Sequence, residues 1–325
     1  MNATLDEHET PDLGTFAEFG EFDSAIESAE AIGIDSGATL LKLCVRDSKG
    51  GLYFATWPSP SRERVLELLA RLSPKRIGVT GCGGAAIVES SGGPALQPIE
   101  FDAWGRGANE ILERSGLASD EPYLLISIGT GTSALRVDGD HVERVGGTAL
   151  GGGTALGLGL ALTGCRSHDE LVALASRGQR GSVDLLISDI YDKVDVPIAA
   201  EATAANFGKL ARSLNRFDAD GVEAGDSRAM LPITPARSED LAAAIMGLVA
   251  ENIALISNAR ATVAGVKRIV YGGSTLYDNP TIVQTVRVLT SVMGFEAIVL
   301  PHSGHAGALG AMLLCSEEGD EGARG

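Results

Sequence analysis

The first residues suited to chemistry lie where an apolar segment ends in a small turn. Residues 31–45, AIGIDSGATLLKLCV, place Asp35 at the end of one apolar run and Lys42 in the next. Small turn residues let an anion approach backbone N–H groups closely. A carboxylate there can hold Mg²⁺ through water, and a lysine can reach nucleotide phosphates. The structural alternatives are a turn-capping aspartate and an exposed strand lysine. The phosphate-binding candidates of this turn are Ser36, Gly37 and Thr39.

A second segment repeats this pattern about 90 residues later. Residues 123–137, YLLISIGTGTSALRV, enclose the turn of Gly129, Thr130, Gly131 and Thr132 between two apolar runs. A plain β-turn needs one glycine and not this set of hydroxyls. Two such hairpins predict two similar halves that close on one polyphosphate, as in a nucleotide-dependent phosphotransferase.

Two further glycine runs are candidates for nucleotide binding. Gly151, Gly152, Gly153 and Thr154 open an expected helix, whose free N–H groups and positive end favour anions. Close helix–sheet packing would also require glycines there. Gly272 and Gly273 follow the strand RIVY and predict either a clamp on the nucleotide or an ordinary strand–helix turn.

Charged residues near these turns are candidates for acid–base and substrate roles. Glu100 and Asp102 precede a helix expected to start near Ala103, and either can accept a proton or cap the helix. Asp102 is better placed for the cap, and Glu100 is freer to point into a cleft. Arg144 can pair with a substrate carboxylate. Arg106, expected in the first turn of a helix where a cation is unfavourable, indicates a functional partner.

The histidines and cysteines predict no metal site. His302 and His305, in LPHSGHAGA, are typical of loop and cap histidines. The four cysteines are scattered without metal-ligand spacing, so we expect buried free thiols in a reducing compartment, the cytoplasm.

These residues must be positioned by alternating strands and helices. The order of elements predicts an α/β protein with helices covering a mixed sheet in each half. We expect an acidic flexible tail over 1–28, an N-terminal half over 29–120 and a C-terminal half over 121–325. Among the expected helices are 61–73, 103–116, 167–178, 182–191 and 238–265, the last started by a Ser cap. Residues 215–239 are expected to form a loop.

Composition and net charge limit the classes of binding partner. The chain has 325 residues, 44% of them apolar, and a net charge of −17. Such a composition predicts a soluble globular protein whose surface repels nucleic acid and anionic membranes. No apolar run reaches the length of about 20 residues that spans a membrane.

With these segments in view, the chain resembles the type II (eukaryotic-like) pantothenate kinases of the acetate kinase/sugar kinase/hsp70/actin superfamily. The resemblance runs from about residue 31 to 315. It is carried by IGIDSGATLLKL, EFDAWGRG, ISIGTGTSALRV, RVGGTALGGGTALGL followed by LTG, ANFGK and VYGGSTL, and RVGGTALGGGT is the most specific of these.

The resemblance implies two actin-like, ribonuclease H-like halves with mixed five-stranded sheets and a nucleotide cleft between them. It implies ATP-dependent phosphorylation of pantothenate, the first step towards coenzyme A. By position, Glu100 matches the catalytic base, and Arg144, Gly147 and Thr148 match the pantothenate site. Asp35 with Mg²⁺, Lys42, the 129–133 turn, Gly151–Thr154 and Gly272 onward match the ATP-binding elements. A homodimer joined by the helix over 238–265 is also implied.

One departure keeps alternatives open. The first turn reads DSGAT, and Ala38 replaces a glycine that is usual in the family; its methyl would crowd a phosphate if φ had to be positive. The alternatives are a kinase of another small hydroxylated substrate, such as an amino sugar, and a non-catalytic nucleotide-binding regulator on the same fold.

Overall fold

The computed structural model describes residues 19–23, 26–59, 61–91, 95–191, 202–214 and 236–321, without the side chains of 212–214 and 318–321. The chain divides into two compact units. Unit 1 comprises Met1–Asp120, Gly139–Val142 and His305–Gly325, and unit 2 comprises Glu121–Asp138 and Glu143–Gly304.

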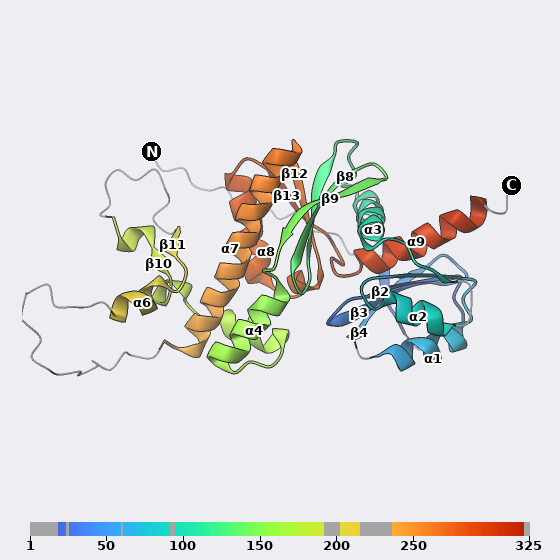
Figure 1. The fold of residues 1–325 in the computed structure, drawn as a ribbon, viewed down its shortest axis with the longest axis horizontal. Coiled ribbons are helices and arrows are strands. Elements are labelled where there is room, and N and C mark those ends of the chain that lie inside the picture. The colour runs from blue at the N-terminus through green and yellow to red at the C-terminus, as the bar shows by residue number, and fades with distance from the viewer. Residues whose placement is uncertain are drawn as a thin grey trace, which may run out of the picture. The chain divides into compact units, whose positions relative to one another are not determined.

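Unit 1 is built on a mixed sheet with the strand order β1-β4-β3-β2-β5-β6 (Figure 1). β2, β3 and β4 are antiparallel neighbours, whereas β5 is parallel to β2 and β6 is parallel to β5. The strands are β1 (Phe19–Glu21), β2 (Ala31–Ser36), β3 (Leu40–Arg46), β4 (Leu52–Pro58), β5 (Arg76–Thr80) and β6 (Ala95–Leu96). The sheet has one strand more than the expected five, because β1, from the segment expected to be a flexible tail, pairs with the edge of β4.

Helices cover both faces of this sheet. α1 (Arg62–Leu72) buries Val65, Leu68, Leu69 and Leu72 in the core formed with the apolar side chains of β2 and β3. α9 (Ala306–Glu321) packs on β2 and β5, and α3 (Glu100–Arg114) packs along α9 (Figure 1). α2 (Gly84–Ser91) follows β5.

The C-terminal helix α9 therefore belongs to unit 1 and not to the half expected over 121–325. Gly33 on β2 and Gly78 on β5 are register partners. A Cβ at either position would overlap the backbone carbonyl of Ala308 or Ala311 on α9. The two glycines allow the helix backbone to lie directly on the sheet, a contact that joins residues far apart in the sequence.

Unit 2 repeats the arrangement of five strands of unit 1, β4-β3-β2-β5-β6. Its sheet has the order β13-β12-β7-β8-β9, with β7 and β8 antiparallel and β12 parallel to both β7 and β13. The strands are β7 (Tyr123–Ile128), β8 (Thr132–Asp138), β9 (His141–Thr148), β12 (Arg268–Gly272) and β13 (Glu296–Val299). The expected pair of similar mixed sheets is thus present.

The helix α7 (Ser238–Ala264) is the centre of the core of unit 2. It packs against α4 (Gly152–Thr163), α5 (His168–Ala175) and α8 (Pro280–Val292). Among the described residues α7 alone is long and apolar enough to cross a membrane, and 67% of its most apolar window is buried inside the protein. Packing within unit 2 accounts for this hydropathy. The expected Ser cap is wrong, because the N-cap residue is Arg237 and Ser238 is the first helical residue.

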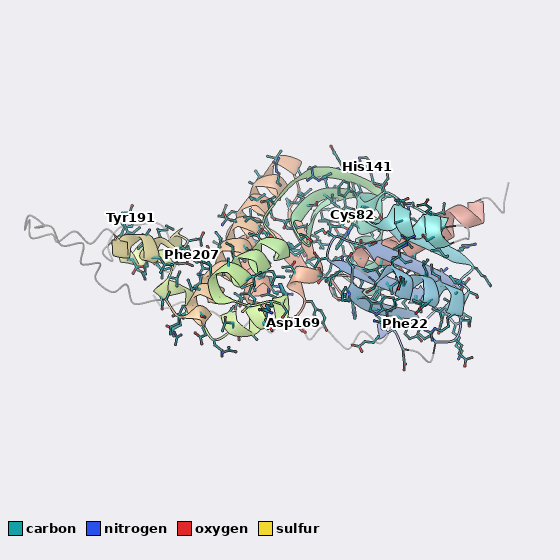
Figure 2. The ribbon with its side chains drawn as sticks, turned by 60° about the horizontal axis from the view of Figure 1, so that its bottom comes forward. Phe22, Cys82, His141, Asp169, Tyr191 and Phe207 are labelled. Carbon is teal, nitrogen blue, oxygen red and sulfur yellow. The ribbon has the colours of Figure 1, made fainter. Side chains whose placement is uncertain are left out.

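The helix expected over 182–191 is also wrong. This segment contains the short strand β10 (Leu185–Leu186), which pairs with β11 (Thr203–Ala205) ahead of α6 (Gly208–Leu214). Buried Asp184 accepts a hydrogen bond from the backbone N–H of Phe207 at 2.8 Å, and it pairs with Arg180 at 2.9 Å. These contacts outcompete the helical pattern. Phe207, labelled in Figure 2, lies between β11 and α6. Most of the loop expected over 215–239 lies outside the described residues.

Candidate functional site

In unit 1, Asp35 and Lys42 form a buried ion pair at the end of the first hairpin. They are register partners on β2 and β3, and the Lys42 Nζ lies 3.3 Å from the Asp35 Oδ2. Asp35 is 2% exposed and Lys42 is 9% exposed. Burial raises the pKa of Asp35, and the charge and hydrogen bond of Lys42 oppose this effect. The pair can present one carboxylate and one ammonium to a polyphosphate.

Glycines line both oxygens of the Asp35 carboxylate. A Cβ at Gly81 would lie 2.8 Å from Oδ1, and a Cβ at Gly307 would lie 2.9 Å from Oδ2. Gly81 follows β5 with φ of +85°, and Gly307 lies in the first turn of α9. These two positions were missed from the sequence, although the run GCGG after a strand was a signal for the first. They leave space beside the carboxylate.

Glu100 is the first residue of α3, so the expected helix start near Ala103 and the expected Asp102 cap are both wrong. The N-cap is Ile99, which makes no side-chain cap bond. The loop before the helix is held by Thr80, whose hydroxyl donates to the Pro98 carbonyl at 3.1 Å. Thr80 is the register partner of Asp35, so this bond ties the start of α3 to the strand end that carries Asp35.

The carboxyl group of Glu100 interacts electrostatically with the Asp35–Lys42 pair. The pKa of Glu100 is raised, first by partial loss of water and then by the negative charge of Asp35, while Lys42 lowers it. A carboxylate with a raised pKa is a better proton acceptor than an ordinary glutamate. Unit 1 therefore brings together three of the predicted site residues.

The turn between β2 and β3 tolerates Ala38 without strain. Neither Gly37 nor Ala38 is among the described residues with positive φ. The condition under which the Ala38 methyl would crowd a phosphate is therefore not met. A Cβ at Gly37 would lie 3.2 Å from Lys42 Nζ, so glycine there leaves space for the ammonium. Ser36 is buried against Gly83, whereas Thr39 is exposed.

In unit 2, the second hairpin and the glycine-rich start of α4 are locked together. Gly152 and Gly153 donate their N–H groups to the carbonyls of Gly129 and Thr130, at 2.8 and 3.0 Å. The expectation that these helix N–H groups are free for an anion is therefore wrong for both. A Cβ at Gly151 would lie 2.7 Å from Thr130 O, so the run also serves close backbone packing.

Hydroxyl groups complete this cluster. Thr132 donates to Leu150 O at 2.7 Å, Thr154 donates to Ala149 O at 2.9 Å, and Leu150 N donates to the Thr148 hydroxyl at 3.2 Å. Thr275, which the sequence did not reveal as a site residue, donates to Gly129 O at 3.0 Å. The threonines thus fix the shape of the turn.

Gly272 and Gly273 lie at the end of β12, next to the end of β7. Gly273 has φ of +115°, and a Cβ there would overlap the Ile128 carbonyl. Its N–H donates to Ser303 O at 2.7 Å. On β9, a Cβ at Gly147 would lie 2.5 Å from Thr132 O and 3.0 Å from an Arg144 guanidinium nitrogen. The predicted turns of unit 2 therefore meet at one place, around the carboxyl ends of β7 and β12.

The other singled-out residues serve the structure. Arg106 lies in the second turn of α3 and pairs with Glu110 at 3.1 Å and Glu317 at 2.9 Å, so carboxylates of the protein supply the partner that the sequence suggested. The His305 ring stacks on Phe54, with centroids 4.6 Å apart. The described residues contain no cluster of three or more His, Cys, Asp or Glu side chains that could hold a metal.

The four cysteines are free, as expected. Cys44, Cys165 and Cys315 are buried, but Cys82 (labelled in Figure 2) is exposed.

Known proteins resemble this chain in sequence. Residues 107–314 match the family model named Fumble. A type II pantothenate kinase of Oceanobacillus iheyensis is 34% identical over 283 residues, covering 87% of this chain and 98% of the relative. One from Staphylococcus haemolyticus is 32% identical, covering 87% of this chain and 99% of the relative.

Solved structures share the fold. The activator of 2-hydroxyisocaproyl-CoA dehydratase from Clostridium difficile, with bound ADPNP, superposes with a TM-score of 0.57 at 21% identity, covering 90% of this chain and 97% of that one. A ROK family glucokinase from Streptomyces griseus gives 0.51 at 15% identity, covering 88% and 99%. These likenesses confirm the expected fold class, and the sequence matches assign the family: the chain belongs to the type II pantothenate kinases.

Proposed function

We propose that this protein phosphorylates pantothenate to 4'-phosphopantothenate with ATP, the first step of coenzyme A biosynthesis. Family membership supports pantothenate as the phosphate acceptor. The two relatives that match this chain over 98% and 99% of their own length are type II pantothenate kinases. The observation that carries the chemistry is the Glu100 carboxyl group beside the Asp35–Lys42 pair. A proton acceptor, a carboxylate that can hold a metal ion and a lysine are among the groups used in phosphoryl transfer to an alcohol.

Glu100 is proposed as the base that accepts the proton of the pantothenate hydroxyl. Its position at the start of a rigid helix, tied to β5 through Thr80, fixes the carboxylate relative to Asp35. Lys42 would neutralise phosphate charge. In unit 2, Arg144, Gly147 and Thr148 would bind pantothenate. Gly129–Thr132, Gly151–Thr154 and Gly272–Gly273 would lie against the nucleotide, with the N–H groups of Gly152 and Gly153 bound to Gly129 and Thr130 and not to the phosphates. Ser36, Gly37 and Thr39 complete the proposed phosphate contacts in unit 1.

Asp35 is proposed to hold Mg²⁺ through water. Mg²⁺ in kinases keeps several waters and binds one or two carboxylates together with the substrate phosphates. A single buried carboxylate whose two oxygens are lined by Gly81 and Gly307 fits that mode. When bound, the ion would neutralise charge on the transferred phosphoryl group.

The proposal includes the oligomeric state of the protein and its location in the cell. Leu255 and Val263 on α7 are 53% and 81% exposed, although α7 is otherwise the core helix of unit 2. Exposed apolar side chains on a long helix can be covered by a second helix. We therefore propose a cytoplasmic homodimer joined through α7.

Replacing Glu100 by Gln tests the proposal most directly. Loss of the base should lower kcat with pantothenate by about 10² to 10⁴-fold. Binding of a non-hydrolysable ATP analogue should be unchanged. Glu113→Gln, an exposed position in the same helix, is the matched control and should keep full activity.

The acceptor is tested with a panel of pantothenate, pantetheine and amino sugars and labelled ATP. Turnover of an amino sugar and not of pantothenate would replace the proposed acceptor. Tight ATP binding without turnover of any acceptor would identify a non-catalytic regulator.

A further inference from the structure

The indole ring of Trp104 lies close to the Asp35 carboxylate in unit 1. A Cβ added to Gly307, in the first turn of α9, would stand 2.9 Å from the Trp104 Nε1 and 2.9 Å from the Asp35 Oδ2. One nitrogen that carries a hydrogen and one carboxylate oxygen therefore border the same small volume. Glycine at position 307 keeps a side chain out of this volume.

Close contact between two helices supports the Trp104 ring. A Cβ at Gly107 of α3 would overlap the Ala306 carbonyl of α9, and a Cβ at Gly310 of α9 would overlap the Ala103 carbonyl of α3. The two glycines allow the helix backbones to lie directly against each other. Both contacts involve residues of α3 within one turn of Trp104, so the indole is carried by a rigid part of the fold.

The Trp104 N–H is a buried donor that has no partner in the described part of the chain. Trp104 is 6% exposed, and its nitrogen donates no hydrogen bond to any described residue, Asp35 included. The Asp35 Oδ2 accepts from Lys42 at 3.3 Å, and a carboxylate oxygen can accept a second hydrogen bond. A buried N–H that stays unpaired costs free energy, so these two atoms are expected to share a bound molecule.

We propose that Trp104 and Asp35 bind one hydroxylic oxygen between them, which accepts a hydrogen bond from the Trp104 N–H and donates one to the Asp35 Oδ2. A group between a donor and an acceptor must itself accept and donate. Water and alcohols do both, whereas an ionised phosphoryl oxygen has no proton to donate and is repelled by a carboxylate. The oxygen therefore belongs to a water molecule or to the alcohol of the phosphate acceptor.

The location gives this oxygen a part in the reaction. Glu100, the proposed base, lies four residues before Trp104 in α3, so the two side chains share one face of the helix. The charge of Asp35 also acts on Glu100. Trp104 thus orients either the acceptor alcohol itself or, through water, the Asp35 carboxylate. This role rests on the proposed function, whereas the binding site for the oxygen does not.

NMR of the indole group tests the binding site directly. The chain has two tryptophans, so Trp57→Phe leaves the Trp104 N–H as the single indole signal. A rotating-frame experiment gives dipolar and exchange cross peaks of opposite sign. In the ligand-free protein, a bound water should give a dipolar cross peak between this N–H and the water resonance. Trp104→Phe is the control, because the remaining N–H of Trp57, a half-buried side chain in β4, should show exchange with bulk water only.

Two additions to the Trp57→Phe protein identify the source of the oxygen. Pantothenate and its analogue that lacks the primary hydroxyl group are added in separate samples. If the acceptor alcohol supplies the oxygen, pantothenate should shift the indole signal and remove any water cross peak, and the analogue should do neither. If water supplies it, the cross peak should persist with both molecules.

Activity measurements test the role of the N–H without changing the shape of the side chain. 3-Benzothienylalanine at position 104 has sulfur in place of the indole N–H, and it should lower kcat about two- to tenfold, the effect of one neutral hydrogen bond. Gly307→Ala adds a methyl against both polar atoms and should exclude the oxygen, with a similar loss of kcat. Combined with benzothienylalanine, it should have no further effect. Gly157→Ala in α4, where a Cβ meets nothing within 4 Å, should keep full activity.

The outcomes are separable. If the Trp104 N–H gives neither a water cross peak nor a shift with pantothenate, the binding site is refuted, whatever the activity. If the cross peak is present but the benzothienylalanine protein keeps the wild-type kcat, the site stands and its part in the reaction is refuted. If wild type phosphorylates no pantothenate, the proposed function fails, and the cross peak in the ligand-free protein still decides whether the site exists.

Discussion

Replacing Lys42 by Met should expose the electrostatic cost of burying Asp35. The change removes the ammonium 3.3 Å from a carboxylate that is 2% exposed, and it keeps most of the apolar volume of the side chain. At an effective dielectric constant of about 20, an ion pair at that distance contributes about 5 kcal/mol. Removing one partner of a buried pair costs about 3–5 kcal/mol in stability. We therefore expect unit 1 to lose about 3–5 kcal/mol at pH 8.

The loss should depend on pH with a defined sign. Burial already raises the folded-state pKa of Asp35, and Lys42 opposes that shift, so its removal raises the pKa further. A carboxyl group with a raised folded-state pKa favours the folded state when protonated, and this stability is lost as pH rises through that pKa. The deficit of Lys42→Met relative to wild type should thus shrink on acidification, by at most about 1.4 kcal/mol per pH unit.

The assay can be confined to unit 1. Both tryptophans of the chain, Trp57 in β4 and Trp104 in α3, lie in that unit. Urea unfolding followed by tryptophan fluorescence at pH 5.5 and pH 8 therefore reports on the fold around Asp35. The double variant Lys42→Met/Asp35→Asn, which leaves no buried charge, should recover most of the loss. A deficit that is equal at both pH values, or a double variant no more stable than Lys42→Met, would refute the reasoning.

Three further outcomes are expected. Asp35→Asn should lower the pKa of Glu100, because it removes the negative charge that raises it; NMR titration of the Glu100 carboxyl carbon measures this, and an unchanged or raised pKa contradicts it. Gly152→Ala places a Cβ 2.5 Å from the Thr275 hydroxyl and should weaken ATP-analogue binding about tenfold by calorimetry, with recovery when Thr275→Ala is added. Val263→Asp should convert the proposed dimer to a monomer in light scattering, and a dimer that persists would exclude α7 as the interface.

Local sequence patterns were sufficient for the elements and for the turns. An apolar run that ends in small residues specifies a strand and its turn over a few residues, and both hairpins are present with the expected boundaries. The same patterns failed where contacts between distant residues decided the conformation. The segment 182–191 has helical periodicity, but Asp184 binds the Phe207 backbone instead. At α3, the helix begins at Glu100 because Thr80 holds the preceding loop, a contact across 18 positions of the chain.

The sequence by itself determined that this protein carries two similar hairpins with small turn residues and the motifs of its family, because these are properties of short segments. The acidic surface follows from the overall composition. Only the tertiary structure decided which charges meet. The pKa of Glu100, at the start of α3, is raised by burial and by the negative charge of Asp35, which lies near the end of β2. Glycines that the sequence marks only as small prove to be required at Gly33 and Gly78, because the backbone of α9, from a remote part of the chain, lies directly against them. Such close approaches depend on three-dimensional packing, and no local pattern contains them.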